Sequence, residues 1–309
     1  MIRQGDGAQA NYRRSETLPL RKLQLVQLLS LLEIKRICDK HNIHYTPIGG
    51  TLLGTVRHKG FIPWDDDIDV GMLREEYNKF LEVAKNELRP EFFLQTYETD
   101  PNYPKAIARL CVNGTRYMLK WEKDADIHHG VFTDIFPYDN SPNDKLQQMY
   151  HKYMIKWLYY ATYHKYSPYQ KPTSIKGKIF SFAVSLPFTF SNKKSVRVLW
   201  DKIMQKYNSV PTKHVVRTGS GYPYEKVRVK RVLMEKFVEM EFEGFKISVL
   251  KGYHEHLSDN YGDYMELPPI EKRRNVQTSC VKLDLGPYED SAYLEQILSK
   301  YKKEFEVIN

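Results

Sequence analysis

The sequence predicts an α/β fold of the α+β type, with a mixed sheet flanked by helices. Between residues 18 and 140, segments with helical periodicity alternate with short apolar segments, a pattern typical of a sheet covered by helices. An aspartate-rich segment and a Gly-Gly turn lie in the same region. The 309 residues are 41% hydrophobic, enough for one large domain or for one domain with a sizeable insertion.

The first helix is predicted at residues 18–41, because leucines recur there at helical spacing until Asn42 breaks the pattern. The elements that follow alternate in type, and the strands are bounded by Gly, Pro and Asn. The helices are expected at 51–57 and 74–88, and the strands at 43–48, 67–71, 92–96, 106–112 and 131–136, the last of these ending at Pro137.

The chain becomes helical and rich in Tyr and Trp over residues 145–166. The apolar stretch at 179–190, flanked by lysines, is too short to span a bilayer. It is interpreted as a buried segment, and the alternative is an interfacial segment that dips into lipid headgroups. Beyond it, helices are expected at 195–207, 253–261 and 291–305, and a mixture of strands and turns at 227–245.

The composition excludes several classes of protein. Cys38, Cys111 and Cys280 are too few and too scattered for a disulfide framework or a Cys-based zinc site, and they fit a reducing, cytoplasmic setting. We expect no signal peptide, because residues 1–14 lack an apolar core. The net charge of +9 favours nucleic acid, anionic lipid or a phosphate-rich glycopolymer, or reflects only a basic surface.

A cluster of aspartates indicates a metal site. Asp67 and Asp69 alternate with Ile68 and Val70, so on a strand their carboxylates leave the same face, which Asp65 shares. Neighbouring carboxylates repel unless a cation or protons relieve them, and oxygen-only clusters suit Mg²⁺ or Mn²⁺. Asp66 is expected on the other face.

A third carboxylate would complete a two-metal site. Asp134 is the best candidate, because it is the one acid on an otherwise apolar predicted strand. Asp139 is a nearby alternative, and the plainer interpretation of Asp134 is a strand-edge acid that faces water.

A phosphate site is expected beside the acids. Gly49 and Gly50 would follow a strand and precede a helix, so backbone N–H groups would face a phosphate, with the Thr51 hydroxyl as a further donor. Arg57 and Arg109 are candidates to hold phosphate oxygens in a bidentate fork. Surface salt bridges are the alternative for both arginines.

Aromatic residues are concentrated near Trp157. Tyr159, Tyr160 and Tyr163 are a possible cage for a quaternary ammonium group, since aromatic faces attract cations. Such stripes on a helix more often belong to a core or an interface.

The segment from Gly49 to Val70, with its Gly-Gly turn and Trp-Asp-Asp-Asp-Ile-Asp motif, resembles the LicD family. A second block, Tyr261 to Pro269, is similar to that family's C-terminal signature, to which we also assign Tyr264, Pro268 and Arg273. The resemblance implies a nucleotidyltransferase-like fold with Gly49 and Gly50 at the phosphates. It also implies that Asp67, Asp69 and Asp134 are catalytic and, with Asp65, bind the metal.

The resemblance further implies transfer of phosphocholine from CDP-choline to a sugar hydroxyl of a teichoic acid or lipopolysaccharide precursor. CDP-ribitol or CDP-glycerol is an alternative donor, and a basic polyanion-binding module without catalysis is an alternative of another class. We expect a cytoplasmic protein, peripheral at the membrane, with a lipid-linked glycan as acceptor and no nucleic-acid partner.

Four regions are predicted on this basis. They are a flexible tail at 1–17, a nucleotidyltransferase-like catalytic core at 18–140, a helical aromatic and basic region facing acceptor or membrane at 141–230, and a C-terminal region completing the active site at 231–309.

Overall fold

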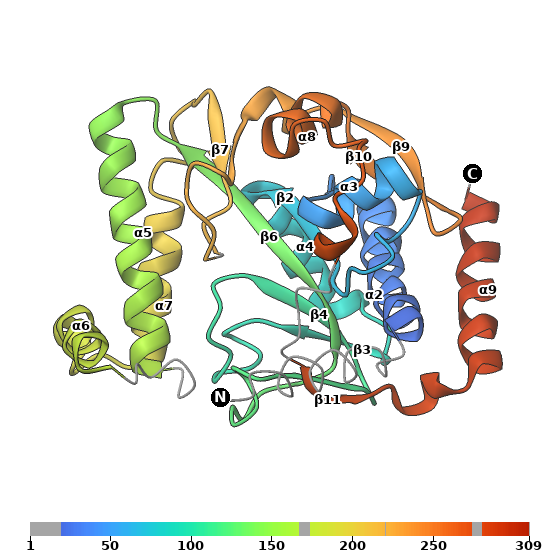
Figure 1. The fold of residues 1–309 in the computed structure, drawn as a ribbon, viewed down its shortest axis with the longest axis horizontal. Helices are drawn as coiled ribbons and strands as arrows, with labels where there is room; N and C mark the ends of the chain where they lie inside the picture. The colour runs from blue at the N-terminus through green and yellow to red at the C-terminus, as the bar shows by residue number, and fades with distance from the viewer. Residues whose placement is uncertain (1–19, 167–173, 220, 274–279, 309) are drawn as a thin grey trace, which may run out of the picture.

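The computed structural model describes residues 20–166, 174–219, 221–273 and 280–308, with the side chains of 163–166 and 308 left out. The predicted tail at 1–17 lies outside these residues. Helices and strands are interspersed between residues 20 and 141, so the α/β class is confirmed (Figure 1). Within the described ranges, no helix has the length and apolar character needed to cross a membrane.

The central sheet has the strand order β1-β2-β6-β4-β3, and β6 also pairs with β7, which pairs with β8. β2 and β6 run parallel and the other pairs run antiparallel, so the sheet is mixed. Its strands are β1 (Thr46–Pro47), β2 (Asp69–Leu73), β3 (Phe92–Gln95), β4 (Ala108–Val112), β6 (Val131–Ser141), β7 (His214–Val216) and β8 (Arg228–Lys230).

The register of the sheet brings the predicted site residues together. Asp69, the first residue of β2, is paired with Asp134 of β6. On the other side of β6, Asp134 is paired with Arg109 of β4. Three positions far apart in the sequence therefore form one row across the sheet.

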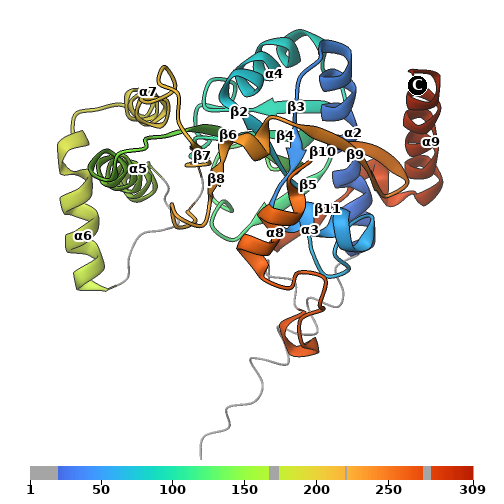
Figure 2. The same cartoon turned by 90° about the horizontal axis from the view of Figure 1, so that it is seen from above.

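Helices cover the sheet. α2 (Leu20–His41) is buried over most of its length and packs on β4 and β6, while α4 (Arg74–Glu87) contacts α2 and β2. α3 (Gly49–His58) connects β1 to the aspartate segment. α9 (Ser291–Ile308) packs against α2 and lies at the edge opposite α5, α6 and α7 in both views (Figures 1 and 2).

A second apolar cluster holds the helical region to the sheet. α5 (Lys145–Tyr166) and α7 (Lys193–Met204) bury Leu158, Trp200 and Met204 together with Val216 of β7. α6 (Ile175–Ser185) and the 3₁₀ turn η2 (Leu186–Phe188) pack on α5 from outside, and α6 is the outermost helix of this side (Figure 2).

The C-terminal part adds two small sheets. β9 (Phe237–Phe242) and β10 (Phe245–Leu250) form a hairpin, and β10 contacts β1. β5 (Arg116–Leu119) pairs with β11 (Cys280–Asp284), and α8 (Tyr253–Tyr261) follows the hairpin. The remaining 3₁₀ turns are η3 (Arg231–Met234), η4 (Ile270–Lys272) and η5 (Gly286–Glu289).

Four predicted boundaries and one burial prediction were wrong. Two residues of the strand predicted at 43–48 are in β1. α3 begins at Gly49, two residues before its predicted start, and β2 begins at Asp69, so Asp67 lies just outside the strand. β6 continues through Pro137 to Ser141, because β7 pairs with its second half.

The burial prediction concerned residues 179–190. α6 has no buried residue, and the Phe182 and Phe190 side chains are 68% and 103% exposed. α5 covers only one side of this apolar helix, so most of the stretch faces solvent in the described structure.

Candidate active site

The aspartate segment forms a crowded acidic site. Burial raises the pKa of Asp65 to about 8, with Asp67 and Asp66 as the next causes and a hydrogen bond to Asp67 adding to them. Burial and the charge of Asp67 also raise the pKa of Asp69 well above its ordinary value, although Arg217 and Lys105 partly offset them. Asp65 and Asp67 are thus hydrogen-bonded to each other, and the charge of Asp67 acts on Asp69 as well.

Asp66 points away from this cluster, as the alternation predicted. Its carboxylate accepts a hydrogen bond of 2.7 Å from the Tyr117 hydroxyl. Its main-chain oxygen accepts one from Gln27 of α2, also at 2.7 Å, and Gln24 holds the main-chain oxygen of Asp65 at 2.8 Å. The polar side chains of a buried helix therefore fix the path of the aspartate segment.

The Gly-Gly turn lies directly against the carboxylates. A Cβ atom at Gly50 would come within 2.5 Å of the Asp65 Oδ2 atom, so no larger residue fits without displacing that carboxylate. Gly49 has a φ of +57°, a left-handed conformation that favours glycine. The Thr51 hydroxyl oxygen accepts a hydrogen bond of 2.9 Å from the Asp69 N–H, so it positions the first residue of β2.

Asp134 lies on the same face of the sheet and is neutralised by two cations. Lys105 Nζ lies 3.0 Å from its Oδ2 atom and Arg109 Nε lies 2.7 Å from Oδ1. Burial raises the pKa of this acid, but the two cations outweigh burial and lower it below the ordinary value. Asp139, the alternative third acid, is instead buried in an ion pair with Arg74 at 2.7 Å.

Arg109 contacts protein groups in the structure. Its guanidinium is 1% exposed, is bound to Asp134 and Glu122, and lies over the Phe132 ring at 3.7 Å. It is not among the residues that line the neighbouring cavity. In the structure Arg109 therefore positions Asp134. The predicted contact of Arg109 with phosphate stays a prediction.

A cavity of about 350 Å³ opens at these acids. Its lining includes three side chains that sequence analysis did not single out: Lys105, Trp121 and Tyr222. Arg217, close enough to affect the pKa of Asp69, was also missed. All four lie in loops or short turns without a recognisable spacing, so only the fold brings them to the acids.

The second motif block, from Tyr261 to Pro269, contacts the first one. Arg57 Nη1 donates to the main-chain oxygens of Tyr264 and Glu266, at 2.9 and 3.2 Å. Arg273 donates to the Pro268 oxygen at 2.7 Å and lies over the Trp64 ring at 5.7 Å. The pKa of Arg57 is lowered, mainly by burial and then by the charge of Arg273, so the two guanidinium groups lie near each other.

The predicted aromatic cage is described only in part. Tyr159 and Tyr160 are in edge-to-face contact, with ring centres 5.6 Å apart, and Tyr160 makes a similar contact with Phe180 of α6. Tyr159 lines the cavity at the acids. The side chain of Tyr163 lies outside the described residues, so the cage stays a prediction.

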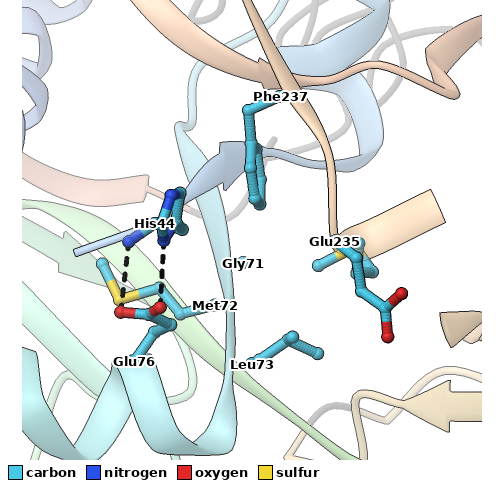
Figure 3. A pocket seen from close by; sticks show the side chains of 8 residues that line it. His44, Gly71, Met72, Leu73, Glu76, Glu235 and Phe237 are labelled. Atoms are coloured by element: carbon cyan, nitrogen blue, oxygen red, sulfur yellow. Dashed lines mark hydrogen bonds and ion pairs between the residues drawn. The ribbon is translucent and has the colours of Figure 1, made fainter. Parts of the chain in front are cut away.

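A separate, smaller cavity of about 190 Å³ lies between β2, α4 and β9 (Figure 3). There His44 pairs with Glu76 at 3.0 Å and stacks on Phe237. None of the predicted site residues lines it, so the candidate active site is the cavity at the aspartates.

Comparisons with known proteins identify the family of this chain. Residues 42–171 match the family described as LicD/FKTN/FKRP, nucleotidyltransferase domain. The chain is 32% identical to the lipopolysaccharide cholinephosphotransferase LicD of Haemophilus influenzae over 262 residues, covering 83% of this chain and 95% of that protein. The chain belongs to the LicD family. The resemblance seen in the sequence is thereby confirmed, and the matched range contains the Gly-Gly turn and every predicted acid.

Two other proteins match shorter parts of the chain. An uncharacterized protein of Rickettsia typhi is 33% identical over 140 residues, which is 45% of this chain and 39% of that protein. One of Rickettsia prowazekii is 40% identical over 70 residues, 23% of this chain and 24% of that protein. Arg217 lies beyond the residues that match the LicD family description, so that match does not cover the whole site.

Proposed function

We propose that this protein transfers phosphocholine from CDP-choline to a sugar hydroxyl of a lipopolysaccharide-type acceptor. Two findings support the proposal together. The acids lie beside the Gly-Gly turn, and the chain is similar over 83% of its length to a lipopolysaccharide cholinephosphotransferase. Teichoic acid stays a second possible acceptor from the family resemblance.

We propose that Asp65, Asp67 and Asp69 hold Mg²⁺ or Mn²⁺. Their oxygen atoms are the donors these cations prefer, and their mutual repulsion in a buried site would be relieved by a cation. No three His, Cys, Asp or Glu side chains are already arranged around a metal in the described parts of the chain. Metal binding therefore requires Asp65 and Asp67 to exchange their hydrogen bond for metal contacts.

A divalent cation there would neutralise the diphosphate and the CMP leaving group. The chain's own groups act around it. Lys105 holds Asp134 from the cavity side, and the N–H groups at the start of α3 lack a capping side chain. Trp121 adds an aromatic surface beside the acids, a second candidate for contact with choline besides Tyr159, which lines the same cavity.

The first experiment measures CMP release from CDP-choline, CDP-ribitol and CDP-glycerol, each with Mg²⁺ and with EDTA. We expect Mg²⁺-dependent release from CDP-choline, and its loss in Asp69→Asn but not in the control Asp124→Asn, an exposed acid elsewhere. Release only from a CDP-polyol would move the donor to the polyol-phosphate alternative. Unchanged release in Asp69→Asn would refute the site.

The polyanion-binding module is the remaining alternative, and the site argues against it. Buried acids repel a polyanion unless a cation neutralises them. If titration shows that the parent protein and Asp69→Asn bind Mg²⁺ equally and neither releases CMP, this alternative replaces the enzyme.

We also propose that α6 rests on an anionic membrane surface at the cytoplasmic face. Residues 145–200 contain nine Lys, one Arg and no Asp or Glu, although the chain has 38 acidic residues. Within this basic region the exposed apolar side chains of Ile179, Phe182 and Phe190 project from α6 and its C-terminal turn. Apolar side chains among lysines are typical of interfacial helices.

Sedimentation with vesicles tests this contact. We expect binding to vesicles with anionic phosphatidylglycerol, and weaker binding to neutral phosphatidylcholine vesicles. Phe182→Ser with Phe190→Ser should reduce binding about tenfold or more, since each buried apolar side chain contributes about 1.5–3 kcal/mol. Val307→Ser, an exposed residue of α9 on the opposite edge, is the control. Equal binding by all variants would refute the contact.

A further inference from the structure

A second cavity lies beside the one at the aspartates. Its volume is about 340 Å³, and the two cavities share Tyr159, Gly221 and Tyr222 in their linings. It is built from α5 and from the segment between β7 and β8, which brings Arg217 and Thr218 to its wall. A ligand here would lie next to a substrate held at the acids.

Two buried polar atoms of this wall have no partner. Arg217 and Thr218 are 9% and 3% exposed. The Arg217 Nη1 and Thr218 Oγ1 atoms make no hydrogen bond to any residue that the structure describes. A buried donor left unpaired costs about 1–3 kcal/mol, so a ligand oxygen that satisfies both atoms would be bound favourably.

The charges of the cavity favour an anion. Lys152 is paired with Glu225 at 2.6 Å, which leaves Lys156 and Arg217 without a carboxylate at ion-pair distance among the described residues. The charge of Arg217 also reaches Asp69, whose pKa it lowers against the larger effect of burial. The cavity thus carries two positive charges next to an acidic site.

The same cations disfavour choline in this cavity. The Arg217 guanidinium lies over the Tyr222 ring at 5.2 Å, and the Lys156 ammonium lies over the Tyr160 ring at 6.0 Å. A face of the Tyr222 ring and a face of the Tyr160 ring, which would attract a trimethylammonium group, are therefore already covered by cations of the protein. A quaternary ammonium would also be repelled by two like charges.

We propose that this cavity binds an anionic group, a phosphate or carboxylate, of the acceptor glycan, with Arg217 and Thr218 as its principal ligands. That it binds an anion follows from the cavity alone. The assignment to the acceptor rests on the proposed function, since a donor held at the acids leaves the adjoining space for the second substrate.

Binding of inorganic phosphate and of glucose 6-phosphate to the metal-free protein tests the anion site. In EDTA we expect both to bind and to raise the melting temperature, while glucose and choline chloride at matched ionic strength do neither. Arg217→Met should weaken phosphate binding about tenfold or more, because a charge-assisted hydrogen bond is lost. Thr218→Val should weaken it less, and Arg116→Met, at an exposed position of β5, is the charge-matched control.

Arg217→Lys is a second variant that keeps the test decisive. If Arg217→Met unfolds, Arg217→Lys keeps the charge but loses the fork and should still bind phosphate more weakly than the parent. Unchanged phosphate affinity in a folded Arg217 variant, or binding of choline in place of phosphate, would overturn the proposal.

Kinetics separate the two possible sources of the anion. With CDP-choline as donor, we expect glucose 6-phosphate to inhibit CMP release without competing with CDP-choline. Competition, together with a raised KM for CDP-choline in Arg217→Met, would assign the cavity to the donor diphosphate and overturn the acceptor assignment. Absence of any CMP release would count against the proposed function, while the phosphate measurements would still decide the anion site.

Discussion

The Arg57 guanidinium donates a hydrogen bond of 2.9 Å to the main-chain oxygen of Tyr264, a residue 207 positions further along the chain. The two motif blocks of the sequence therefore meet in one place. Because Arg57 lies in the last turn of α3, the helix that begins at the Gly-Gly turn, the C-terminal block is tied to the same element that lies against the acids.

Arg57→Lys should loosen this tie. A lysine ammonium can replace only part of these contacts, because Arg57 Nη1 donates to the Tyr264 and Glu266 oxygens while its Nε atom donates to His58 Nε2. We expect faster hydrogen exchange in residues 262–272, a small change in melting temperature and a clear loss of CMP release. Arg116→Lys is the control, and unchanged exchange in this segment would contradict the tie.

Gly50→Ala should disable the acidic site with little effect elsewhere. The added Cβ would lie 2.5 Å from the Asp65 Oδ2 atom and push that carboxylate out of place. A misplacement of about 1 Å can cost about 100-fold in rate. The double variant Gly50→Ala with Asp65→Ala should lose far less stability than the sum of the losses in the two single variants. A double-mutant cycle in urea would measure this difference.

The metal-free protein should lose stability as the pH rises through 8. The pKa of Asp65 is raised to about 8 and that of Asp69 is raised too, so the folded state retains protons that the unfolded chain releases near pH 4. Between pH 6.5 and 8.5 in EDTA we expect the free energy of unfolding to fall by about 1–2 kcal/mol.

Saturating Mg²⁺ should abolish this fall, because the cation replaces the protons. Asp69→Asn should reduce it. The lowered pKa of Asp134 acts in the opposite direction, but its contribution is lost only below pH 4. A flat pH profile in EDTA would show that these carboxylates do not interact as the structure places them.

Asp139→Asn should destabilise the fold strongly. Asp139 is fully buried and binds Arg74 through both carboxylate oxygens, at 2.7 and 2.8 Å. Removing its charge leaves a buried guanidinium with only partial compensation from Asp201, at an expected cost of about 3 kcal/mol in urea unfolding. Glu82→Gln breaks the exposed pair with Lys85 and should cost less than about 0.5 kcal/mol.

Local patterns in the sequence were enough to predict the acids. The alternation of Asp67 and Asp69 predicted a shared face, and the apolar surroundings of Asp134 predicted a strand, so the register of two parallel strands was enough to join them. Arg217 and Lys105 carried no such pattern. Their place at the site depends on how β7 pairs with β6 and on the loop before β4, which are long-range features of the fold.

The burial of the apolar stretch at 179–190, by contrast, could not be predicted from its local sequence. Its composition alone is the same for a core segment and for an interfacial helix, so burial was favoured because most apolar runs are buried. Whether enough neighbouring elements exist to cover it is a property of the whole structure. In the described residues α5 covers one side of α6, and the other side stays exposed.

The hydrogen bond between Arg57 and Tyr264 also bears on the order in which parts of the site are synthesised. Gln24, Gln27 and the acids emerge early, so the aspartate segment can dock on its helix while synthesis continues. The hairpin that supports β1, through the Leu250 N–H and the Thr46 hydroxyl, and the block that Arg57 holds begin 168 or more residues after Asp69. The segment from Asp65 to Asp69 is thus synthesised before these later parts, and a free divalent cation would be available during that time to neutralise its carboxylates.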